Sequence, residues 1–109
     1  MTRAELEALA ERVEREGPGM MLDIYIAEAV TGHEHTPPVL RYTTSLDAAV
    51  TLVPVGCAWT LTLNEFRAEA VIGHPYRFSE IGRGITKRHP AAALTAAALR
   101  ARAQEAGDE

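Results

Sequence analysis

The sequence has one cysteine, few aromatic residues and no long apolar run. The lone Cys57 cannot form a disulfide within the chain or build a thiolate metal site, so we expect a reducing, cytoplasmic location. The longest uncharged stretch, residues 48–64, is interrupted by Pro54 and Gly56 and does not suit a membrane span. The first ten residues contain charged side chains and no apolar segment, which argues against a signal peptide. These features predict a soluble protein with no membrane partner.

A strong net charge is also missing, because 15 acidic and 11 basic side chains leave a balance of −4 over 109 residues. Nucleic-acid-binding domains usually carry a basic total, so a nucleic-acid partner is disfavoured. The balance is uneven, however: residues 1–35 sum to −5 and residues 36–104 to +4. With 47% apolar residues, the length suits a single domain over residues 1–109. The basic body either faces solvent or binds an anion.

Apolar residues at helical spacing predict two helices near the N-terminus. Thr2 and Glu5 have the spacing of a capping box, and the apolar face that follows predicts a helix over residues 3–16. After Gly17-Pro18-Gly19, a second helix is expected over residues 20–30, with Gly32 as its stop. The run Ile24-Tyr25-Ile26 is also compatible with a strand. Apolar side chains surround most of this second helix, which indicates deep burial or a subunit contact.

The middle of the chain predicts a third helix and a β-hairpin. A loop over residues 33–38 and a short extended segment over 39–42 precede Thr44, the expected cap of a helix that ends at Pro54. Period-two alternation then predicts strands over residues 57–63 and 66–72, with Trp59 and Phe66 on the inner face. The two-residue turn Asn64-Glu65 makes these strands antiparallel.

The C-terminal part predicts a third strand over residues 76–81, a flexible glycine loop over 82–84 and a last helix. Pro90 suits the first turn of this helix, Gly107 its end, and residues 104–109 are expected to fray. Helices that enclose a small antiparallel sheet make an α+β fold. We therefore predict an α-β-α layered sandwich with about three strands and four helices.

Several segments resemble the phage ABA sandwich domain family. They are YTTSLDAAVTLVP at residues 42–54, the following strand with Trp59, the opening residues 6–14 and the alanine-rich ending at residues 89–102. The resemblance implies a small layered domain encoded by a phage or prophage, working in the cytoplasm of the infected bacterium. The resemblance implies no catalytic residues. Residues 33–38 and 75–88 fit the family pattern least well, so we expect individual function there.

The strongest candidate site is an anion-binding cluster. Hydroxyls at a helix N-terminus favour negative charge, arginines near a glycine loop can close over a ligand, and aromatic faces can stack on a base. The candidate ligand-binding residues are Arg41, Tyr42, Thr43, Thr44, Trp59, Tyr76, Arg77, Arg83, Lys87 and Arg88. The alternative interpretation is an ordinary helix cap, a core tryptophan and solvated basic side chains.

Other reactive groups give weaker signals. His33, Glu34 and His35, with two more distant histidines, form the one metal constellation in the sequence, and a solvated loop explains them as well. Cys57 has no partner at a catalytic spacing, so we expect a buried apolar thiol. Neither serine lies in a nucleophile elbow, and no phosphate-binding glycine loop is found. We expect no enzyme activity, metal or cofactor.

These observations predict a non-enzymatic phage protein. In its concrete form it is a homo-oligomeric sponge that sequesters a nucleotide-derived immune signal, an anti-defence role that needs binding but no chemistry. The alternative is a structural or protein–protein interaction module that binds a phage or host factor through its acidic first helix. Nucleic-acid binding through the basic body is the third hypothesis.

Overall fold

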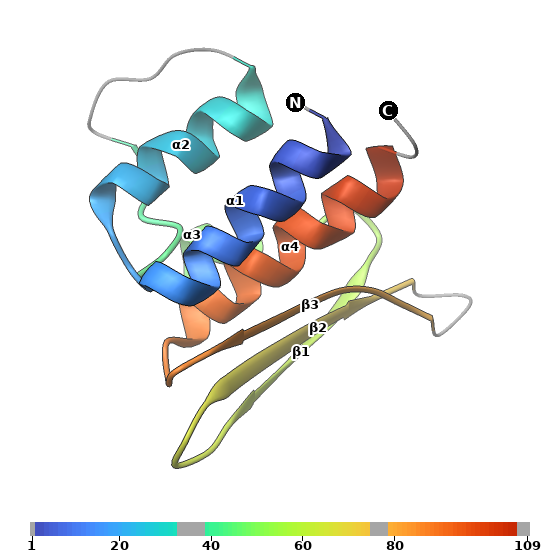
Figure 1. Cartoon of the computed structure of the whole chain (residues 1–109). Coiled ribbons are helices and arrows are strands. Elements are labelled where there is room, and N and C mark those ends of the chain that lie inside the picture. The colour runs from blue at the N-terminus through green and yellow to red at the C-terminus, as the bar shows by residue number, and fades with distance from the viewer. Residues whose placement is uncertain (1, 33–38, 75–78, 107–109) are drawn as a thin grey trace.

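The computed structural model describes residues 2–32, 39–74 and 79–106 (Figure 1), and these residues form four helices and one three-stranded sheet. The helices are α1 (Arg3–Glu16), α2 (Met20–Thr31), α3 (Leu46–Val50) and α4 (Pro90–Ala106). The strands β1 (Ala58–Leu63), β2 (Ala68–Gly73) and β3 (Glu80–Thr86) are antiparallel in the order β1-β2-β3. The predicted α+β class, the helix number and the strand number are confirmed.

The helices lie on one side of the sheet (Figure 1). α4 packs on β2 and β3, while α1 and α3 both pack against α4 and α2 contacts α1. For the described residues the layer order is therefore sheet, then α4 with its neighbours. The predicted α-β-α layering is not found among them, because their helices all lie on one face of the sheet. No helix within the described residues is both long and apolar enough to cross a membrane.

The first and last helices follow their sequence signals. The Thr2 side chain accepts a hydrogen bond from the Glu5 backbone N–H and caps α1, which is the cap predicted by the sequence. α1 buries Leu6, Leu9 and Val13 on one face. α4 begins at Pro90 and runs to Ala106, so residues 104–106 are helical although the sequence predicted fraying from 104. Its residues 91–99 are all buried, which makes α4 the central element of the fold.

The interface between α4 and β3 is built from small residues. A Cβ atom on Gly84 would lie 2.0 Å from the Ala93 carbonyl oxygen, and one on Gly82 would lie 2.2 Å from the Ala97 carbonyl oxygen. Ala93, Ala97 and Ala101 are four residues apart and so share one helix face. Helix and strand backbones therefore approach each other at distances that only glycine permits.

The prediction of a glycine loop over residues 82–84 is wrong. These residues lie inside β3, paired with β2 at Ile72, Val71 and Ala70. Glycine weakens an isolated strand, which is why the sequence pattern favoured a loop. Burial of α4 against the strand compensates for that weakness, and a glycine within a strand often marks such a close approach.

Two further boundaries differ from the sequence prediction. Ser45, not Thr44, caps α3, because its side chain accepts a hydrogen bond from the Ala48 N–H, and α3 has only five residues. The hairpin turn spans residues 64–67, since the Asn64 side chain accepts hydrogen bonds from the N–H groups of Phe66 and Arg67. Phe66 consequently lies in the turn and is exposed, not on the inner face of a strand.

We predict that Gly84→Ala destabilises the fold by about 3 kcal/mol, because the new methyl group must push the α4 backbone away from β3. Urea unfolding followed by circular dichroism measures the change. Gly73→Ala is the matched control in a neighbouring strand, since its Cβ would lie 3.4 Å from the nearest atom, the Ser79 carbonyl oxygen. Equal stability of the two variants would contradict the close approach.

Candidate functional site

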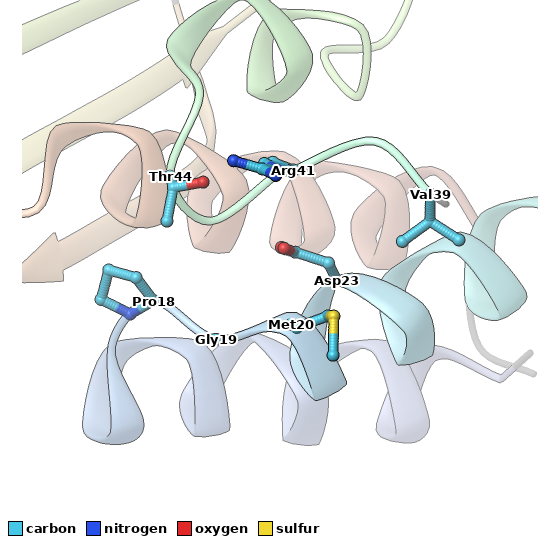
Figure 2. A pocket seen from close by; sticks show the side chains of 7 residues that line it. All are labelled: Pro18, Gly19, Met20, Asp23, Val39, Arg41 and Thr44. Atoms are coloured by element: carbon cyan, nitrogen blue, oxygen red, sulfur yellow. The ribbon is translucent and has the colours of Figure 1, made fainter. Parts of the chain in front are cut away.

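A pocket of about 430 Å³ opens between the connection from α1 to α2 and the extended segment before α3 (Figure 2). Its wall comprises Pro18, Gly19, Met20, Asp23, Val39, Arg41 and Thr44. Gly19 precedes α2 and provides no side-chain cap, so the first backbone N–H groups of that helix lack one. The pocket therefore combines an uncapped helix N-terminus with side chains from two separate segments.

Asp23 and Thr43 hold the two walls of the pocket together. The Asp23 carboxylate accepts hydrogen bonds from the Thr43 backbone N–H at 2.9 Å and from its hydroxyl at 2.8 Å. The Thr43 hydroxyl oxygen also accepts a hydrogen bond from the Gly19 N–H at 3.0 Å. Both side chains are almost completely buried. This cluster fixes the start of α2 against the segment that carries Arg41 and Thr44.

Arg41 and Thr44 are the predicted ligand residues that the pocket brings together. Both are exposed, and in Figure 2 the Asp23 carboxylate points from α2 toward the segment that carries them. No ion-pair partner of the Arg41 guanidinium is found among the described residues. The pocket thus presents an accessible cation beside a buried carboxylate, and it can bind a group that both accepts and donates hydrogen bonds.

Two predicted ligand residues of the same segment contribute to the interior. Thr43 makes the cluster with Asp23, and Tyr42 is buried, with its carbonyl oxygen accepting a hydrogen bond from the Thr95 hydroxyl at 2.7 Å. Burial is also the main cause that raises the pKa of the Tyr42 phenol. The helix N-terminus expected to bind an anion belongs to α3, which is too short to have a substantial dipole.

The remaining predicted ligand residues are not part of this pocket. Arg83 lies on β3 and forms ion pairs with Glu80 and Glu69, and the hydrogen bonds from Arg83 to Glu80 and then to Glu69 are the main causes that raise the pKa of Arg83. Trp59 lies on β1, while Lys87 and Arg88 occupy the exposed turn before α4. Tyr76 and Arg77 lie outside the described residues. The eight described residues among the ten candidate ligand-binding residues therefore do not form one site, but lie in several parts of the surface and interior.

Other candidate chemistry finds little support in the described residues. Burial is the main cause that raises the pKa of the Cys57 thiol, and the nearby Glu105 adds to it, so the reactive thiolate is disfavoured at neutral pH. No group of three potential metal-binding side chains is found in the described part of the chain. The metal candidate at residues 33–35 lies outside it.

Asp23 and Gly19 line the pocket but are not among the ligand-binding residues that the sequence predicts. Asp23 is the one charged residue among the apolar side chains of residues 20–27, and it becomes almost fully buried. An acidic residue at such a position signals a buried hydrogen-bond partner, because an unpaired buried charge is costly. Its partner, twenty residues later, is not visible from spacing.

Comparisons of the chain with protein-family models, curated proteins and solved structures find no match.

We predict that Thr43→Val destabilises the protein by about 2 kcal/mol, because it leaves the buried Asp23 carboxylate and the Gly19 N–H without the hydroxyl. Thermal unfolding at neutral pH measures the loss. Thr44→Val is the matched control on the exposed neighbour and is expected to change stability by less than about 0.5 kcal/mol. Indistinguishable unfolding of the two variants would show that the cluster does not hold the pocket.

Proposed function

We propose that the protein is a non-enzymatic binding protein that takes a nucleotide-type small molecule in the pocket between α2 and the segment before α3. The observation that carries this proposal is the accessible Arg41 guanidinium, which has no ion-pair partner among the described residues and lines a pocket of about 430 Å³. A volume of this size lies within the range of small-molecule sites.

The chemistry of the pocket favours a phosphate group beside a hydrogen-bond donor. A guanidinium pairs with phosphate through two parallel hydrogen bonds, and a helix N-terminus adds favourable N–H groups and a positive partial charge. α2 has twelve residues and begins at Met20, in the pocket wall. The Asp23 carboxylate repels a second anionic group, and it attracts a donor such as a base or sugar N–H or O–H. Nucleotides carry both kinds of group.

In its most specific form, the proposal is a phage-encoded sponge that sequesters a nucleotide-derived immune signal in the cytoplasm of the infected bacterium. The phage origin rests on the resemblance to the phage ABA sandwich domain family. Sequestration works by mass action and requires affinity and protein concentration but no reaction. Nothing in this role needs a nucleophile, a metal or a cofactor.

Isothermal titration calorimetry against cyclic dinucleotides and ADP-ribose tests the proposal. We expect micromolar or tighter binding of one of these compounds, and Arg41→Ala is expected to weaken it about tenfold or more, because it removes a charge-assisted hydrogen bond. Arg67→Ala is the control, since Arg67 is an exposed arginine in the hairpin turn and does not line the pocket. No heat with any compound well above micromolar protein concentration would contradict this function.

A second candidate function is protein–protein interaction through the groove between α1 and α2. This groove has a volume of about 360 Å³ and is lined by Glu5, Ala8, Leu9, Arg12, Tyr25 and Glu28. Arg12 is held by its ion pair with Glu16 and lies 5.3 Å from the centre of the Tyr25 ring. The remaining carboxylates and the apolar floor suit a basic, amphipathic segment of a phage or host protein.

A pull-down comparing the wild type with the double variant Glu5→Lys and Glu28→Lys tests the second function. We expect the wild type to retain one basic protein and the variant to lose most of it, because like charges replace attraction at the groove. Glu65→Lys, in the hairpin turn, is the control and should retain the partner. A partner that persists on the groove variant would exclude this surface.

A further inference from the structure

The two outer edges of the sheet differ in whether their backbone N–H and C=O groups are hydrogen-bonded. In the described structure, β3 is one edge and β1 is the other. The β3 edge is covered by side chains: the Ile85 N–H donates to the Glu14 carboxylate at 2.7 Å, and the Arg83 carbonyl oxygen accepts from Arg100 at 2.7 Å. Glu14 and Arg100 also form a bidentate ion pair at 2.6 Å, which raises the pKa of Arg100. Two backbone groups of this edge are therefore already satisfied by side chains, which disfavours pairing with another strand.

The hydrogen-bond pattern identifies the groups on the β1 edge. The Asn64 N–H donates to the Arg67 carbonyl oxygen, so residues 64 and 67 are a hydrogen-bonded pair. Along an antiparallel ladder, hydrogen-bonded and non-hydrogen-bonded residue pairs alternate. The backbone groups of Thr62, Thr60 and Ala58 therefore also bond to β2. The N–H and C=O groups of Trp59, Leu61 and Leu63 consequently point away from the sheet, and no partner for them is found in the described chain.

The same three residues also carry apolar side chains that α4 leaves partly uncovered. They are paired with Ile72, Ala70 and Ala68, so their side chains lie on the helix face of the sheet. α4 packs on β3 and β2 and barely reaches β1. Trp59 is therefore 37% exposed and Leu63 52% exposed, although β2 is buried on this face. β1 contains no charged residue that would discourage pairing.

We propose that β1 is a self-association surface and that it pairs antiparallel with β1 of a second copy, around a twofold axis at Leu61. The outward residues are symmetric about Leu61, so this register sets Leu61 opposite its own copy and Trp59 opposite Leu63 of the other chain. All six outward N–H groups then find an outward C=O group. Any register shifted by one residue would set outward groups against inward ones.

The ends of the strand fit the same arrangement. Val55 precedes β1 and Phe66 follows it, and both are among the most exposed apolar side chains of the protein. An antiparallel dimer brings the Phe66 end of one copy beside the Val55 end of the other. The paired sheets form one sheet of six strands, with both α4 helices on the same face and the two β3 edges outermost. We expect the dimer to be finite, because Glu14 and Arg100 occupy backbone groups at both outer edges.

Sedimentation velocity at tens of micromolar full-length protein tests the proposal. We expect the wild type to sediment as a dimer. Leu61→Lys and Leu61→Glu should each raise the dissociation constant at least about tenfold, because like charges meet at the twofold axis. An equimolar mixture of the two variants should regain the dimer, because opposite charges then meet there. Recovery in the mixture also shows that both variants are folded.

Thr62→Lys is the matched control. Its side chain lies on the opposite face of the same strand, and in the dimer it faces Thr60 of the other chain, so the dimer should persist. A monomeric wild type would overturn the proposal, as would a Leu61→Lys variant that dimerises like the wild type. A mixture of the two charged variants that stays monomeric, with native circular dichroism spectra, would also overturn it. None of these results depends on the pocket near Arg41.

Discussion

The close approach of α4 to β3 is the constraint on which the rest of the structure depends. Because Gly82 and Gly84 have no Cβ atoms, the backbone of α4 lies directly on β3. The two glycines face alanines of α4. α4 is thereby drawn toward β3 and β2, and it becomes the element against which α1 and α3 pack. Buried alanines supply little apolar area each, so the short backbone-to-backbone distance and tight packing carry the stability of this interface.

The position of α4 over β3 and β2, rather than over β1, creates the difference between the two sheet edges. On the β3 side, α1 and α4 lie close enough for Glu14 and Arg100, respectively, to satisfy backbone groups of the strand. On the β1 side, α4 barely reaches the strand, and the apolar side chains of β1 stay partly exposed. Natural sheets protect their edges by charge, covering elements or pairing. Here the first two devices act on β3, which leaves pairing as the remaining one for β1.

The pocket near Arg41 lies on the helical side of the molecule, away from the strands, and depends on a different interaction. The buried bonds between Asp23 and Thr43 join α2 to the segment before α3, so the pocket walls are fixed before any ligand binds. A preformed site loses less entropy on binding than one that must be ordered. The two proposed surfaces use separate residues, and a dimer through β1 leaves both copies of the pocket wall free of the strand interface.

Local patterns in the sequence determined most helices, the antiparallel hairpin and the α+β class, because capping residues and apolar periodicity act over a few positions. They did not determine that Gly82 and Gly84 lie inside a strand, since a glycine favours a loop unless a helix packs against it. They identified Arg41 and Thr44 as candidate ligand residues but also included Tyr42 and Thr43, which tertiary contacts bury. Asp23 meets Thr43 across twenty residues, and only the tertiary structure decides such a pair, because no local spacing encodes it. The exposure of β1 likewise follows from the position of α4, which the alternating pattern of Trp59, Leu61 and Leu63 does not contain.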